Sequence, residues 1–219
     1  MTLIENYREL FSILIEMHFK LKKLNILSEE ISIDFKSFRL PSQEIVHANE
    51  HIMRTFASEL GLITDTTTMP NYIEDNLKKA IAHYYRAIFD SLDYISIILR
   101  SKIVNVLNQY PPNVIMHVLP DYYTTIRPAI MNLTIDINEL RASKELSDIK
   151  SVSSKVDKYI EIIDKILVFH RKLEASLPDF NNLIRETKYN KVKSQIFIAL
   201  ISILFASLST WLVISFLSP

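Results

Sequence analysis

The chain has 219 residues, of which 48% are hydrophobic and 23% charged, enough for one sizeable packed core and too apolar for a disordered protein. Lysine and arginine together number 25, as do aspartate and glutamate, so no broad basic face favours direct binding of nucleic acid. One glycine, Gly61, is too few for a P-loop or a dinucleotide-binding turn, and the lack of cysteine excludes disulfides and thiol catalysis. The first residues show no basic segment or cleavage site, so we expect no secretory signal and a cytosolic N-terminus.

The first part of the chain predicts two helices and a connection. Apolar residues recur every three or four positions from Leu3 to Leu24, the spacing of an amphipathic helix. Residues Ile31 to Phe35 alternate like a strand, but no second alternating run exists to pair with them, so we interpret them as an extended connection. A second helix is predicted from Ser42 to Leu60, with Ser42 as its N-cap and Gly61 as its stop.

The third predicted helix is the central one. It begins at Pro70 or Asn71 and runs to about Tyr110, where two prolines close it. At roughly 40 residues it would be about 60 Å long. A near-heptad apolar seam indicates that it is the spine of a bundle. The seam comprises Leu77, Ile81, Tyr84, Ile88, Leu92, Ile95 and Leu99, broadened by Tyr85 and Phe89.

Three further helices are predicted after this spine. The fourth runs from Asp121 to about Lys150 with a kink at Pro128, and the fifth runs from Ser153 to Ala175. The residues expected to point inward from the fifth helix are Val156, Ile160, Ile163, Leu167 and Phe169. The last helix begins at Pro178, and because nothing interrupts it, we expect it to continue into the apolar segment that follows.

The segment from Ile196 to Leu217 contains about 22 residues without a charge, which is long enough to cross the hydrocarbon core of a bilayer. A buried core helix is the alternative interpretation, although core helices are seldom so uniformly apolar. The predicted fold class is therefore all-α: a cytosolic helical bundle over residues 1–190 with a long central helix, and a single C-terminal transmembrane helix within residues 191–219.

The predicted span also has an expected orientation. Three lysines precede it, at Lys188, Lys191 and Lys193, whereas only Ser218 and Pro219 follow it. The positive-inside rule then places the N-terminus in the cytoplasm and the C-terminus outside, in a single-pass protein inserted after synthesis as a tail anchor.

Small and hydroxyl side chains follow one face of the predicted span. Ala199, Ser202, Ala206 and Ser209 are spaced by three and four residues. Such a face lets helices approach closely and hydrogen-bond in lipid, so it predicts a homo-oligomer interface in the membrane. The alternative is that these residues are simply tolerated in a helix facing lipid. Since the span contains no charge, a single copy offers no path for ions, and only a ring of copies would make a pore.

Two polar patterns are candidate sites in the soluble part. Glu44, His47 and His51 share one helical face, and His83 or Asp90 would complete a metal site if the second and third helices pack together. The alternative is an ordinary polar helix surface. On the central helix, His83, Arg86, Asp90 and Asp93 form a polar stripe that is either a solvated face or a partly buried cluster sensing a ligand or partner.

The segment His83-Tyr84-Tyr85-Arg86-Ala87-Ile88-Phe89-Asp90-Ser91-Leu92-Asp93, within a long central helix, resembles the HEPN-type bundles of prokaryotic antiviral and abortive-infection systems. RNA-cutting members of that group carry an Arg-x4–6-His motif. In this chain Ser91 occupies the position after Arg86 at which the motif first allows histidine, and no other arginine is followed by a histidine at the spacing of the motif. Ribonuclease activity is therefore not expected of this chain. The resemblance implies instead a membrane-bound effector.

These observations lead to one hypothesis and two alternatives. In the hypothesis, the cytosolic bundle receives a protein partner or signal, and copies clustered through their membrane helices permeabilise the lipid bilayer and depolarise it, as an antiviral effector or toxin would. The alternatives are a tail-anchored adaptor that binds a protein partner and a metal-dependent membrane-bound enzyme. No catalytic motif is visible, so we expect neither an enzyme nor a cofactor.

Overall fold

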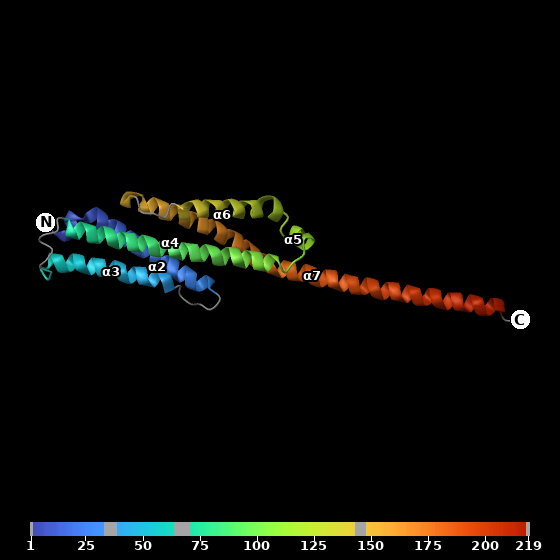
Figure 1. Ribbon diagram of the computed structural model, residues 1–219. Coiled ribbons are helices and arrows are strands. Elements are labelled where there is room, and N and C mark those ends of the chain that lie inside the picture. The colour runs from blue at the N-terminus through green and yellow to red at the C-terminus, as the bar shows by residue number, and fades with distance from the viewer. Residues whose placement is uncertain (1, 33–38, 64–70, 143–147, 218–219) are drawn as a thin grey trace.

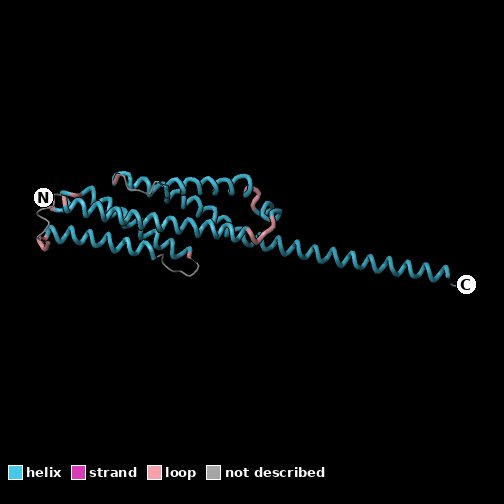
Figure 2. The backbone as a smooth tube through the Cα atoms, viewed as in Figure 1, coloured by secondary structure: helices cyan, strands magenta, loops and turns pink. Residues whose placement is uncertain are grey.

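The computed structural model describes residues 2–32, 39–63, 71–142 and 148–217, and the side chains of residues 39–40 and 207–217 lie outside that description. All regular elements in these residues are helical, which confirms the predicted all-α class (Figure 2). The elements are α1 (Leu3–Asn6), α2 (Arg8–Ile31), α3 (Arg39–Glu59), α4 (Tyr72–Leu107), α5 (Pro112–Val118), η2 (Tyr122–Ile126), α6 (Arg127–Ala142), η3 (Ile149–Ser151) and α7 (Val152–Leu217).

Helix α4 is the central helix of the bundle, as its seam predicted. It packs against α2, α3 and α7 (Figure 1). All seven residues of the predicted seam are buried, and so are Tyr85 and Phe89. Because helices cover α4 on several sides, its buried surface is wider than the single stripe of an amphipathic surface helix.

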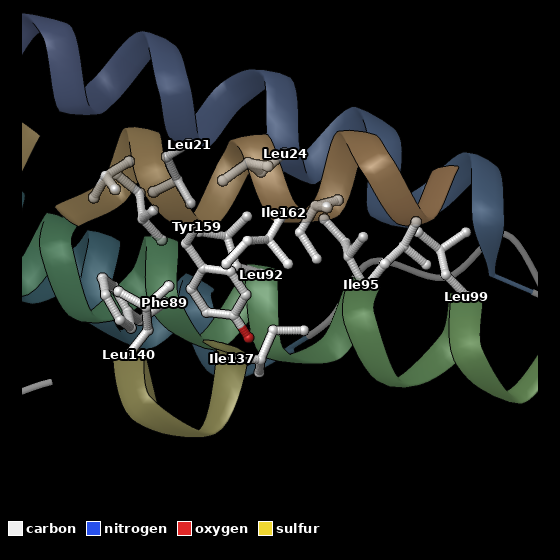
Figure 3. Close-up of a cluster of buried hydrophobic side chains, with 14 of the residues drawn as sticks. Leu21, Leu24, Phe89, Leu92, Ile95, Leu99, Ile137, Leu140, Tyr159 and Ile162 are labelled. Atoms are coloured by element: carbon white, nitrogen blue, oxygen red, sulfur yellow. The ribbon is translucent and has the colours of Figure 1, made fainter. Parts of the chain in front are cut away.

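The core lies where α2, α4, α6 and α7 meet. Figure 3 shows side chains from all four helices interdigitating there, with Phe89 and Leu92 of α4 beside Tyr159 of α7. The side chains of Phe89, Leu92 and Tyr159 have no measurable exposure. Truncating a buried leucine or phenylalanine at such a point costs about 2–5 kcal/mol, since a cavity remains after the contact is lost.

Helix α7 packs on the bundle through a seam whose buried residues follow steps of four and three residues and then of seven. The seam comprises Val152, Val156, Tyr159, Ile163, Ile166, Leu173 and Phe180, and Ile162 beside it is also buried. This is the a/d spacing of left-handed helix packing. Of the residues predicted to point inward, Val156 and Ile163 are buried, but Ile160, Leu167 and Phe169 are only half-buried. These three still pack against the core from its edge, whereas Tyr159 and Ile166, which were not predicted, occupy the centre of the seam.

A helix break at Pro178 was predicted, and this prediction is wrong. The fifth and last predicted helices are one helix of 66 residues with Pro178 inside it. Proline lacks the N–H that would bond the carbonyl oxygen of Glu174. Burial of Leu173 and Phe180 on either side of that gap holds the helix in place. The predicted continuation of the last helix is confirmed for the backbone, which is helical to Leu217.

The N-terminal segment differs from the single helix predicted from Leu3 to Leu24. Tyr7, with φ −120° and ψ 31°, separates α1 from α2. Helix α2 then continues past Leu24 to Ile31. Of the predicted extended connection, Ile31 is helical and Ser32 is extended with ψ 145°, and the remainder lies outside the described residues.

The start of α3 differs from the prediction, whereas its end agrees. The helix begins at Arg39, so Ser42 lies inside it and is not the N-cap. Pro41 is tolerated because the first-turn N–H groups need no helical partner. At the other end, Gly61 has φ 68°, its N–H donates to the carbonyl oxygen of Ser58, and the next N–H donates to that of Ala57. This Schellman arrangement confirms Gly61 as the stop.

The predicted fourth helix is shorter than expected and starts differently. A π-helical turn, η2, precedes α6, and Pro128 lies in the first turn of α6, so it starts a helix and does not kink one. Helix α6 ends at Ala142, and residues 143–147 of the predicted helix lie outside the described residues. The short helix α5 was not predicted; Pro112 stands in its first turn, where proline is favoured.

Candidate functional site

The packing of α3 against α4 brings four predicted site residues together. His83 of α4 lies beside Glu44, His47 and His51 of α3. The ring centroids of His47 and His83 are 5.2 Å apart, and those of His51 and His83 are 5.3 Å apart in a stacked arrangement. The Oε2 atom of Glu44 lies 2.7 Å from Nδ1 of His83. The three-residue and four-residue spacing on α3 places its side chains in one row, and His83 meets that row from the other helix.

Glu44 is the acceptor at the centre of this cluster. Arg86 Nε donates to Glu44 Oε2 over 2.9 Å, and Nη2 of the same guanidinium lies 2.8 Å from His83 Nδ1. Burial opposes ionisation of the carboxyl group, but the hydrogen bonds from His83 and Arg86 outweigh it and hold the pKa of Glu44 below its ordinary value. Glu44 is therefore an anionic ligand at neutral pH.

His83 is biased toward its neutral form. Burial lowers the pKa of His83, and the positive charge of Arg86 acts in the same direction, while the hydrogen bond to Glu44 partly opposes them. A neutral imidazole retains one nitrogen lone pair. Nδ1 of a neutral His83 donates to Glu44 Oε2 in one tautomer and accepts from Arg86 Nη2 in the other.

A buried amide fixes the orientation of His51. Nδ1 of His51 lies 2.8 Å from Oδ1 of Asn76, and Nδ2 of Asn76 donates to the backbone oxygen of Tyr72 over 2.8 Å. The second contact places the amide oxygen toward His51, so Nδ1 of that ring is the donor. The sequence analysis missed Asn76, which only the pairing of α3 with α4 brings into play.

The predicted polar stripe of α4 serves two interfaces. His83 and Arg86 face Glu44 of α3, as described above, and Asp90 is half-buried and has an interaction partner of its own. Asp93 lies at the other interface, where it accepts a 2.6 Å hydrogen bond from Tyr159 of α7 and pairs with Arg141 of α6. The stripe is thus partly buried and fixes the positions of helices around α4.

The far end of α7 extends beyond the bundle. Phe180 is the last fully buried residue among the described side chains of α7, and residues 184–206 are all exposed. Figure 1 shows this part as a lone helix projecting from the end of the bundle opposite the N-terminus. Ala199, Ser202 and Ala206 of the predicted oligomer face are exposed, and the Ser202 hydroxyl donates to the backbone oxygen of Ile198. The side chain of Ser209 lies outside the described residues.

Within the side chains that the structure describes, no helix is long and apolar enough to cross a membrane. Residues 207–217, which form the second half of the predicted span, lie outside that part. Comparison of the chain with protein-family models, with curated proteins and with solved structures gives no match.

Proposed function

We propose that this protein is a membrane-anchored effector whose helical bundle is attached to the bilayer by the end of α7, and whose copies assemble there to permeabilise the membrane. One observation carries the proposal: α7 is a single helix that packs on the bundle as far as Phe180, projects from it, and exposes large apolar side chains on its projecting part from Ile196 to Phe205.

The exposed apolar side chains are the first support. Phe197 is 63% exposed, Ile203 65% and Phe205 74%, and their neighbours are similar. Leaving such a side chain in water costs about 1.5–3 kcal/mol relative to full burial. A run of them on one isolated helix therefore requires another apolar surface that shields these side chains from water. The sequence continues without a charge to Leu217, which makes a lipid bilayer the cover that fits all sides of the helix at once.

The lysines before the apolar run are the second support. Lys188, Lys191 and Lys193 are exposed on the projecting part of α7, immediately before Ile196. Lysines at this position lie at the cytoplasmic headgroup level in an inserted helix. The bundle would then stay in the cytoplasm, and the C-terminus would lie outside.

The continuity of α7 provides the coupling between the bundle and the anchor. A change in packing around Tyr159 or Phe180 would be transmitted along the same helix to Ala199 and Ser202, the small face through which copies associate. A partner that binds the bundle would in this way control assembly. The HEPN-type resemblance of residues 83–93 favours antiviral defence as the setting.

The test is the membrane potential of cells that express three forms of the protein. These are the full chain, the chain ending at Lys193, and the variant carrying Ala199→Leu, Ser202→Leu, Ala206→Leu and Ser209→Leu. We expect depolarisation from the full chain alone, because the shortened form lacks the anchor and the leucine variant inserts without associating. An unchanged potential with all three, despite insertion of the full chain, would contradict permeabilisation.

An adaptor is distinguished from an effector by exchanging the span. If residues 196–217 are replaced by an unrelated transmembrane helix, an adaptor retains its function, because its anchor only determines location. The effector loses its function, because its anchor supplies the assembling face.

A further inference from the structure

We propose that Glu44, His47 and His83 form a binding site for a divalent transition-metal ion, with Zn²⁺ as the ion that fits best. One ligand-capable atom from each of these residues lies within 4.8 Å of the other two. Zinc bonds of about 2.0–2.2 Å place neighbouring ligand atoms roughly 3.3–3.6 Å apart, so a movement of about 1 Å by these side chains closes the site.

The donor set suits zinc. Two imidazoles and one carboxylate are the three protein ligands of a four-coordinate zinc site whose fourth position takes water or a further ligand. Imidazole also binds copper and nickel, whereas the absence of thiolates from the chain makes the site a poor match for ions that prefer sulfur. The ligands come from two helices, so a bound ion would join α3 to α4.

His51 adjoins this triad, although it is not one of the three residues whose ligand atoms lie within 4.8 Å of one another. Its ring is stacked on that of His83, and its Nδ1 donates to the buried amide oxygen of Asn76. Metal-binding histidines usually have this arrangement, in which the second nitrogen donates to a fixed acceptor that orients the ring. The Asn76 amide is itself held by the backbone oxygen of Tyr72.

Arg86 contacts two of the three proposed ligand residues and would compete with an ion for them. Its guanidinium contacts both Glu44 Oε2 and His83 Nδ1, the atoms of the only two half-buried members of the ligand triad. The Arg86 side chain is 44% exposed, so it can turn into solvent without leaving a buried charge unpaired. Binding of a cation would displace it, and Arg86 therefore lowers the affinity of the site for metal.

A simple ion pair explains this cluster less well. Arg86 and Glu44 need no histidine to pair, and a surface pair of this kind is worth only about 0–1 kcal/mol. Three imidazole rings nevertheless gather here: His83 contacts Glu44, and the rings of His47 and His51, both from α3, lie next to the ring of His83. A metal ion gives each of these rings a role, because imidazole is its commonest nitrogen ligand.

The experiment measures Zn²⁺ binding to the purified full chain in detergent micelles, after removal of metal with a chelator. We expect one Zn²⁺ per chain and a rise in melting temperature on addition. His47→Ala should weaken binding at least tenfold with the fold intact, since His47 is exposed, and Glu44→Gln should do the same. His117→Ala is the matched control, because it removes an exposed histidine from α5 and should leave binding unchanged.

Arg86→Gln distinguishes a metal site from a structural ion pair. It removes the competing cation, so we expect Zn²⁺ to bind several-fold more tightly while the metal-free protein becomes no more stable. Three results would each overturn the proposal. The first is that Zn²⁺ binds equally strongly to the His47→Ala and His117→Ala variants. The others are that Arg86→Gln leaves Zn²⁺ binding unchanged or weakens it, and that the protein binds no Zn²⁺ below millimolar concentration. None of these results bears on the membrane anchor, because the variants that test the anchor change only residues that follow Lys193.

Discussion

The hydroxyl group of Tyr159 donates a 2.6 Å hydrogen bond to Oδ1 of Asp93, and Nε of Arg141 lies 3.2 Å from the same oxygen atom. Three helices, α7, α4 and α6, therefore meet at one carboxylate. The hydrogen bond is short because its acceptor is charged. This contact fixes the register of α7 against α4 beside the core, within the part of α7 that packs on the bundle.

Replacing Tyr159 with phenylalanine tests the strength of this contact. The change removes only the hydroxyl group and leaves Asp93, which is 17% exposed, with one partner fewer. We expect the free energy of unfolding of the bundle to fall by about 1–3 kcal/mol, the cost of a partly buried acceptor that loses its donor. Thermal or chemical denaturation measures this loss. Tyr189→Phe, at a position 68% exposed, is the control and should change nothing.

The ionisation of Tyr159 gives a second test. Burial, followed by the hydrogen bond to Asp93 and its negative charge, raises the pKa of Tyr159 far above the ordinary value of 10.0. The unfolded chain releases this proton near that value and the folded chain retains it. The contribution of Tyr159 to stability is thus fully present below the ordinary pKa and is lost as the pH rises above it.

An alkaline titration of tyrosinate absorbance measures this behaviour. Wild type and Tyr159→Phe should show the same tyrosinate signal until the protein unfolds, because Tyr159 does not contribute before that point. A wild-type signal larger by one tyrosine at a pH where the fold is intact would show that Tyr159 is free to ionise.

Pro178 is expected to lower the stability of α7. It stands inside the helix just before Phe180 and removes one backbone hydrogen bond. Pro178→Ala should stabilise the folded bundle by about 1–3 kcal/mol, since proline is about 3 kcal/mol less favourable than alanine in a helix interior. Pro112→Ala is the matched control, because Pro112 occupies the first turn of α5, where no hydrogen bond is lost. Equal effects of the two changes would show that Pro178 imposes no strain.

Replacing Gly61 is expected to lower the stability of the protein through backbone strain alone. Its φ is +68°, and among the described residues other than its two chain neighbours no atom lies within 4 Å of an added Cβ. Gly61→Ala should therefore destabilise the protein by about 1 kcal/mol through left-handed strain without any clash. Gly61→Asn should cost less, because asparagine tolerates this conformation better. Thermal denaturation of the two variants checks the order, and a smaller loss for alanine would contradict it.

The long helices were predictable because their apolar periodicity repeats over many turns. The seam of α4 from Leu77 to Leu99 is an example, and all of its residues are buried as expected. Proline was a poorer guide in three places. Pro41 and Pro128 lie in first turns, where the missing N–H has no cost, and Pro178 is tolerated within a helix that is packed on both sides of it.

Only the part of the candidate metal site that lies on a single helix was predictable from the sequence. Spacing along one helix placed Glu44, His47 and His51 on one face, since positions three and four apart are neighbours. The contribution of Asn76, and that of Tyr159 to the Asp93 cluster, depends on how separate helices align. Periodicity does not determine that alignment to within one residue, which is also why Ile160 was chosen over Tyr159 for the seam of α7.

The most direct test of the assembling membrane helix is disulfide cross-linking of single-cysteine variants in membranes, which the lack of native cysteine makes unambiguous. Ser202→Cys lies on the small face, and Phe197→Cys lies on the opposite face of the same helix and serves as the control. The account predicts that oxidation of membranes containing the full chain links Ser202→Cys into dimers and leaves Phe197→Cys monomeric. Dimers from neither variant, or equally from both, would contradict assembly through this face.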